Sequence, residues 1–149
     1  MGKVIEGIIE RPLKIISDER GSVMHMLRCD DEGFDGFGEV YFSSVNAGVV
    51  KGWKKHTRAT QNFAVPIGKI KLVIYDDRKD SSTFDTIQEV VLGVNDYKLV
   101  CVPANVWYSF GAIGEMALLA NCTDLAYDPQ ESISMPLDAE DIPYKWSNK

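Results

Sequence analysis

Residues 51–63, "KGWKKHTRATQNF", carry the side chains best suited to chemistry, and they are strongly cationic in a chain of net charge −6. Lys51, Lys54, Lys55 and Arg58 surround His56. Imidazole titrates near neutral pH, so His56 is a candidate general base. Lysine and arginine bind phosphate oxygens through charged hydrogen bonds. The stretch therefore predicts either an anion site with acid–base chemistry beside it or a solvated basic edge strand.

Strand geometry separates these side chains into two faces. Successive side chains of a strand alternate, so Gly52, Lys54 and His56 should share one face, with Lys55 on the other. We expect the first face to line the interior. Lys54 is a second candidate acid–base group if its surroundings help the ammonium group to release a proton. Tyr108, in "PANVWYSF", is a third, as a proton donor or as a stabiliser of an oxyanion.

The elements that must position these residues are short strands. Segments rich in β-branched and aromatic residues recur between turn sequences such as "ERG", "NAG" and "GVND", and no long helical period precedes the tail. The pattern predicts one all-β domain over residues 1–149, with residues 129–149 as a tail that wraps the surface. We expect strands within residues 4–9, 13–17, 22–27, 39–45, 49–53, 62–67, 69–75, 88–92, 98–103, 106–110 and 116–121.

The amino-acid composition excludes some classes of binding partner. The acidic balance, with an isoelectric point near 4.9, argues against nucleic acid or an anionic membrane as the main partner. The N-terminal residues do not resemble a secretory signal, and no apolar stretch approaches the length of a membrane helix. We therefore expect a cytoplasmic protein.

The spacing of the opening stretch matches the first motif of the cupin jelly roll. Gly48, Lys54, His56, Gln61 and Gly68 occupy its Gly, His, His, Glu and Gly positions, and Tyr108 occupies the histidine of the second motif. Three of the four metal-ligand positions thus hold poor ligands, because a protonated lysine repels a divalent cation and Gln and Tyr are weak. The sequence predicts a cupin double-stranded β-helix (jelly roll) that needs no metal and no other cofactor.

Five further segments resemble the dTDP-4-dehydrorhamnose 3,5-epimerase-like sugar-nucleotide cupins. They are "SDERGSVMHM", "GVVKGW", "YDDRKDSSTF", "NCTDLAYDPQES" and "DIPYKW", in the family's order, and the resemblance runs from about Leu13 to Trp146. It implies an epimerase or ketoisomerase that moves protons next to the ketone of a nucleotide-linked keto-deoxysugar, in surface polysaccharide synthesis. It also implies a homodimer.

The chain departs from that family at its catalytic positions. Lys54 replaces the family's catalytic histidine, and Ala120 or Asn121 stands where the family has its catalytic tyrosine. The aspartate that orients the base lies, in the family, after the terminal tryptophan. We therefore expect His56, Lys54 and Tyr108 to be catalytic here instead.

The resemblance also indicates the ligand, a nucleotide-diphosphate sugar. Its two negative charges would explain the local excess of lysine and arginine. The expected substrate-binding residues are Arg20, His25, Lys51, Gln61, Asn62 and Asn121. Two other functions stay open: a non-catalytic cupin that binds a sugar nucleotide, and, less favoured by the ligand count, a metal-dependent oxygenase.

Overall fold

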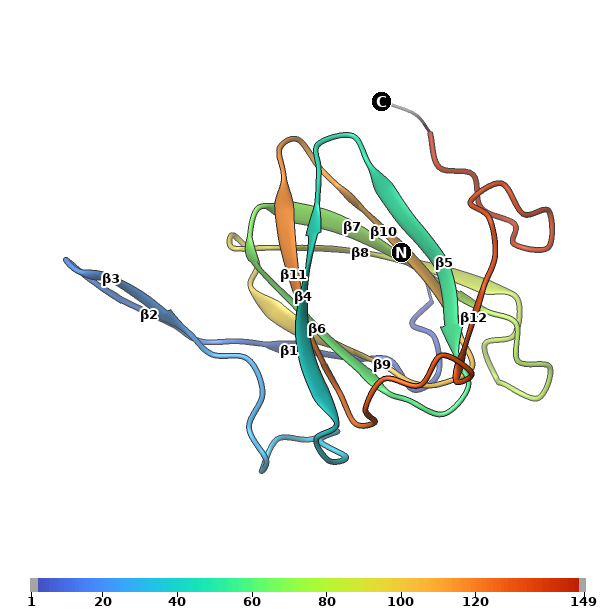
Figure 1. Cartoon of the computed structure of the whole chain (residues 1–149), viewed down its shortest axis with the longest axis horizontal. Coiled ribbons are helices and arrows are strands. Elements are labelled where there is room, and N and C mark those ends of the chain that lie inside the picture. Colours follow the sequence, from blue (N-terminus) through green and yellow to red (C-terminus); the bar gives the residue numbers. More distant parts are fainter. Residues whose placement is uncertain (1–2, 148–149) are drawn as a thin grey trace.

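Two antiparallel sheets face each other in the computed structural model, which describes residues 3–147 (Figure 1). One sheet has the order β1-β9-β6-β11-β4 and the other β12-β5-β10-β7-β8, while β2 and β3 form a separate hairpin. The strands are β1 (Ile9–Pro12), β2 (Ile15–Asp18), β3 (Gly21–Met24), β4 (Glu39–Val45), β5 (Val50–His56), β6 (Gln61–Ile67), β7 (Lys69–Asp76), β8 (Thr86–Gly93), β9 (Lys98–Val102), β10 (Trp107–Ala112), β11 (Ala117–Thr123) and β12 (Ser132–Ser134).

The predicted all-β jelly roll is confirmed, although several strand bounds differ and β12, within the tail, was not expected. The first strand covers Ile9–Pro12 rather than residues 4–9, because Glu6 and Gly7 form a turn and Gly7 has a φ of 95°. Within residues 3–147 no helix is long and apolar enough to cross a membrane.

Alternation along the strands builds the interior. Side chains that pair directly across strands point to the same face, so the inward positions of both sheets meet in one apolar cluster. Phe63 on β6, Leu119 on β11 and Phe110 on β10 belong to this cluster. Between β4 and β5, by contrast, polar and charged side chains line the interior.

A β-bulge in β5 changes which residues point inward. Tyr108 pairs with Lys54 but Ser109 pairs with Gly52, so Trp53 is an extra residue opposite β10. Lys51 therefore joins Lys54 and His56 on the inner face, and Gly52 borders the same pocket. Gly52 has a φ of 131°, and a Cβ there would collide with Ser109, so only glycine fits.

The C-terminal tail covers the outer face of the sheet that contains β5. β12 pairs with β5, and Ile142, Tyr144 and Trp146 pack on the outward-facing Trp53 with its aromatic neighbours. The indole Nε1 of Trp146 donates to Ser109 Oγ over 2.8 Å. The tail thus holds β5 from outside; residues 148–149 lie outside the described range.

Candidate active site

Two adjoining hollows open between β4 and β5. The first, about 290 Å³, has an apolar floor that includes Phe63, Phe110 and Leu119. The second, about 280 Å³, extends past His56 toward Glu131. Tyr41 and Lys54 line both, which makes the hollows one continuous site. Such a concave site, apolar with a few convergent polar groups, suits a small-molecule ligand.

Three side chains form a hydrogen-bonded chain along the β5 wall. Glu131 Oε1 lies 2.7 Å from His56 Nδ1, and His56 Nε2 lies 3.1 Å from the Tyr108 hydroxyl. The rings of His56 and Tyr108 are nearly parallel, with centroids 5.9 Å apart. Burial raises the pKa of Tyr108, with further contributions from Tyr41 and Glu131, so its hydroxyl stays protonated at neutral pH.

Glu131 is held as an anion by the residues around it. Burial raises the pKa of Glu131, but hydrogen bonds from His56 and from the Arg58 and Ala59 amides outweigh that effect, so the pKa lies below its usual value. Both amides donate to Oε2, at 3.0 and 2.8 Å. An ionised Glu131 accepts the Nδ1 proton of His56, so Nε2 of the neutral imidazole is left as a proton acceptor.

The opposite wall is formed by β4 with polar support from β11 and β6. Tyr41 projects into the site and its hydroxyl oxygen accepts from Asn121 Nδ2 over 2.9 Å. The same Asn121 nitrogen donates to Gln61 Oε1 over 2.6 Å. Gln61 and Asn121 are both buried. They therefore support Tyr41 from behind rather than lie free in the pocket.

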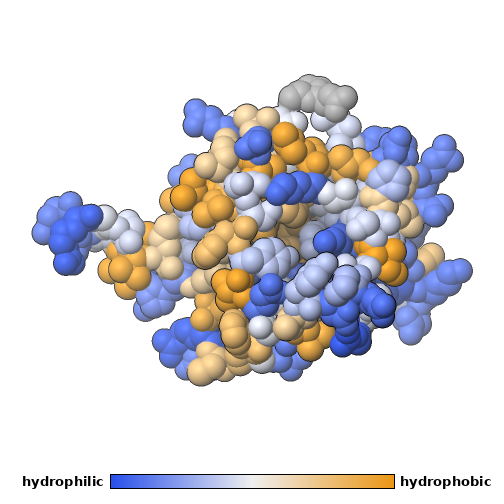
Figure 2. Space-filling view, in the orientation of Figure 1, coloured by the Kyte–Doolittle hydropathy of each residue, from blue (hydrophilic) through white to orange (hydrophobic). Residues whose placement is uncertain are grey.

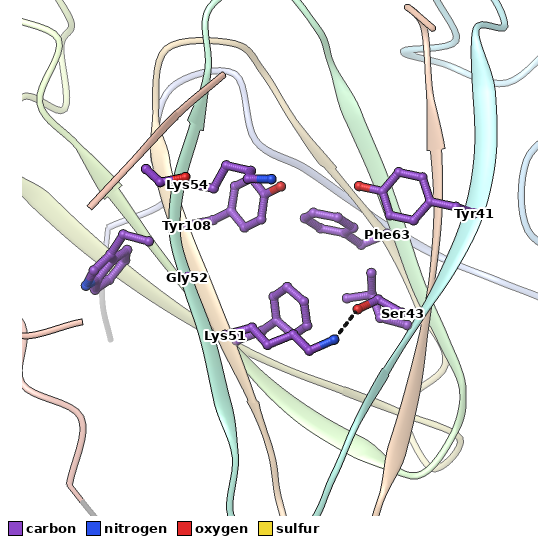
Figure 3. A pocket seen from close by; sticks show the side chains of 11 residues that line it. Tyr41, Ser43, Lys51, Gly52, Lys54, Phe63 and Tyr108 are labelled. Atoms are coloured by element: carbon purple, nitrogen blue, oxygen red, sulfur yellow. Dashed lines mark hydrogen bonds between the residues drawn. The ribbon is translucent and has the colours of Figure 1, made fainter. Parts of the chain in front are cut away.

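Two of the clustered lysines remain available to an anionic ligand. Lys51 Nζ reaches across the opening to Ser43 Oγ, 2.9 Å away (Figure 3). Lys54 has no carboxylate partner among residues 3–147. By contrast, Lys55 points outward to Asp77, as predicted. Arg58 pairs with Asp128. The cationic cluster is therefore partly a solvated edge and partly a pocket wall.

Five of the six expected substrate-binding residues do not line this pocket, and two of them, Gln61 and Asn121, lie behind Tyr41. Arg20 lies in the β2–β3 turn, 83% exposed and paired with Asp18, and the hairpin projects away from the barrel (Figure 1). His25 follows β3 and lies in a different surface hollow beside Arg11. Asn62 points to the outer face of β6, where its amide donates to the Cys122 carbonyl. Within one chain, Lys51 is therefore the expected substrate-binding residue that lines the pocket.

The sequence reasoning missed Tyr41, Ser43, Phe63 and Glu131. Glu131 had a usable signal, because it lies in the segment "NCTDLAYDPQES" that carried the resemblance. The position of Tyr41 depends on how β4 pairs with β11, where Tyr41 faces Asn121. That pairing joins residues about 80 positions apart, which local sequence patterns do not reveal.

Three of the four cupin metal-ligand positions lie together, while the fourth, Gln61, bonds Asn121 instead. His56 contacts Tyr108, Lys54 pairs with Tyr108 across the strands, and Gln61 lies behind on β6. Among residues 3–147, no group of three His, Cys, Asp or Glu side chains is placed to hold a metal ion. The expectation of metal-independent chemistry therefore continues to rest on the poor ligand set.

Comparison with known proteins identifies the family. The family model described as dTDP-4-dehydrorhamnose 3,5-epimerase matches residues 3–149. A probable low-salt glycan biosynthesis epimerase, Agl13, from Haloferax volcanii is 34% identical over 94% of this chain and 88% of its own length. The spore coat polysaccharide biosynthesis protein SpsL from Bacillus subtilis is 27% identical over 98% of this chain and 99% of its own length.

Comparison with solved structures supports the same assignment. A dTDP sugar isomerase from Desulfovibrio desulfuricans is 45% identical, with a TM-score of 0.93 over 95% of this chain and 92% of that chain. The epimerase RmlC from Legionella pneumophila, solved with dTDP-4-keto-L-rhamnose, has a TM-score of 0.86 at 22% identity, which supports the fold alone. The expected resemblance is confirmed, and the chain belongs to the dTDP-4-dehydrorhamnose 3,5-epimerase family.

Proposed function

We propose that the protein is a metal-independent epimerase or ketoisomerase acting on a nucleotide-linked 4-keto-6-deoxysugar in surface polysaccharide synthesis. The observation that carries this proposal is the Glu131–His56–Tyr108 chain beside Lys54, at the wall of a pocket with lysines at its opening. Family membership and the polysaccharide-related names of its relatives support it. The cytoplasm remains the proposed compartment.

The proposed chemistry begins with proton removal next to the ketone. His56 Nε2 accepts the proton, directed by the Nδ1 hydrogen bond to Glu131. The ketone oxygen becomes an enolate, and Lys54 or the Tyr108 hydroxyl stabilises its negative charge. Return of a proton to the opposite face of the same carbon gives the epimer. Where that carbon carries a hydroxyl, the hydroxyl proton can pass to the former ketone oxygen, and return of a proton to the former ketone carbon then moves the ketone. No metal is needed for either outcome.

The diphosphate should bind at Lys51. We expect Lys51→Ala to weaken binding of a dTDP-sugar by about tenfold or more, since a charged hydrogen bond to phosphate is worth roughly 1.5–3 kcal/mol. Titration calorimetry with wild type and variant measures the effect. Lys55→Ala is the matched control, because Lys55 lies on the same strand but points outward to Asp77. Equal losses in both variants, or none in Lys51→Ala, would place the diphosphate elsewhere.

A non-catalytic sugar-nucleotide binder is the alternative, because the family's usual histidine position holds Lys54. Proton abstraction leaves a trace that separates the two functions. In D₂O, an enzyme replaces the proton next to the ketone of a dTDP-4-keto-6-deoxysugar by deuterium, which mass spectrometry detects. Tight binding without exchange on a panel of 4-keto substrates would establish the binder.

We also propose a homodimer, for which exposed apolar surface gives physical support. The edge strand β4 has outward-facing Val40 and Phe42 that are 48% and 64% exposed. The β2–β3 hairpin also exposes Ile16 and Val23, and Figure 2 shows its hydrophilic tip and the apolar side chains near its base. Arg20 and His25 would then have to act in the pocket of the second copy, since they do not reach their own.

The dimer is tested by sedimentation velocity. We expect wild type to sediment as a dimer, and Phe42→Glu to shift it toward monomer, because a charge at a buried contact loses its hydration. Glu89 lies on β8, away from β4, so Glu89→Gln serves as the control. A wild type that stays monomeric at high concentration would contradict this proposal.

A further inference from the structure

The β4 wall of the pocket carries one group suited to donating a proton. Glu39, Tyr41 and Ser43 share the inward face of β4. Ser43 already accepts a hydrogen bond from Lys51. Glu39 lines the second hollow but not the first, whereas Tyr41 lines both. Tyr41 is thus the β4 residue that reaches the whole site.

The hydroxyl oxygen of Tyr41 is held by Asn121 at the edge of the ligand space. Its oxygen accepts from Asn121 Nδ2, and Asn121 is in turn fixed by Gln61. Among residues 3–147, no group accepts the Tyr41 hydroxyl proton. Partial burial of Tyr41, which is 39% exposed, raises its pKa by more than the Asn121 hydrogen bond lowers it. At neutral pH the side chain therefore carries a proton that it can donate.

The two walls approach a ligand from opposite sides. Figure 3 shows the hydroxyls of Tyr41 and Tyr108 directed toward one another across the pocket, with Phe63 between the two side chains in this view. Tyr108 belongs to the base side, through His56. A flat sugar ring placed between the walls would present one face to His56 and Lys54 and the other face to Tyr41.

We propose that Tyr41 is a catalytic residue that protonates the enolate on the face opposite His56 and so makes the reaction an epimerisation. His56 takes the proton as the C–H bond breaks and the electron pair forms the enolate. The enolate carbon then takes the Tyr41 hydroxyl proton, which leaves a tyrosinate beside Asn121. Solvent water reprotonates Tyr41, and His56 releases its proton to solvent, so the net change is inversion at one carbon.

This inference rests on the proposed function, and Tyr41→Phe separates the two. The variant removes the donated proton, while Asn121 keeps its hydrogen bond to Gln61. In D₂O we expect the rate of deuterium exchange at the carbon next to the ketone to be within a few-fold of the wild-type rate in Tyr41→Phe. The reason is that His56 can return deuterium to the face from which it took the proton. Inversion, read from NMR coupling constants, should fall by about 10²-fold or more.

Matched variants test the assignment. Tyr144→Phe, on the outer face, removes a tyrosine hydroxyl that bonds Glu89 and should leave inversion unchanged. Inversion that survives in Tyr41→Phe, or is lost in Glu39→Gln instead, would overturn the proposal. If wild type moves the ketone without inverting a carbon, the role of Tyr41 is also overturned, but the proposed function stands. A wild type without any exchange would overturn both. Thermal unfolding checks that each variant is folded.

Discussion

His56→Ala should slow deuterium exchange next to the ketone by about 10²–10⁴-fold, the usual worth of a positioned acid–base group. His56 is the imidazole of the pocket, and an ionised Glu131 leaves its Nε2 unprotonated, next to the Tyr108 hydroxyl. Mass spectrometry of a dTDP-4-keto-6-deoxysugar incubated in D₂O gives the rate. Binding of dTDP should survive better than exchange, because the diphosphate is assigned to Lys51 at the pocket opening.

Lys54→Ala should lower the exchange rate over the same range of about 10²–10⁴-fold if its ammonium group stabilises the enolate. Its neighbour Lys55 is the control, since alternation along β5 places that side chain outside, against Asp77 and Trp107. Full exchange in both His56→Ala and Lys54→Ala would contradict the assigned base. Tyr108 would then be the next residue to vary.

Most of the fold could be predicted from sequence because its signals are local. Alternating β-branched and aromatic residues between turn sequences indicate the strands, and the spacing from Gly48 to Gly68 indicates the jelly roll. The bulge at Trp53 could not be predicted. It depends on the fit of Gly52 against Ser109, a contact between strands that lie over fifty residues apart.

The site was predicted on one wall only. Lys51, Lys54 and His56 lie within six positions of one strand, so a motif could reveal them. Tyr41 and Glu131 come from β4 and from the segment before β12, and only sheet pairing brings them to the pocket. Arg20, His25 and Asn62 were expected in the pocket but lie elsewhere. The family spacing shows neither where a hairpin projects nor which face of a strand a residue occupies.

Glu131 should be the residue that decides which nitrogen of His56 carries the proton. Its Oε2 accepts from the Arg58 and Ala59 amides, and its Oε1 accepts from His56 Nδ1. In Glu131→Gln, the amide oxygen can keep the two backbone hydrogen bonds, so the NH₂ group must face His56. That group donates to Nδ1, which moves the imidazole proton to Nε2 and removes the acceptor from the pocket.

We therefore expect Glu131→Gln to reduce exchange by about 10²-fold or more, with dTDP binding nearly unchanged. Because the pKa of Glu131 is lowered on folding, its ionisation stabilises the native state above about pH 4.5, and this contribution is lost as the pH falls through the folded-state pKa. Urea unfolding should show wild type more stable than the variant at neutral pH, with the gap narrowing in acid. Glu89→Gln, which removes a charge from the outer face, should reproduce neither effect. Normal exchange in Glu131→Gln would mean that Glu131 only ties the tail to β5.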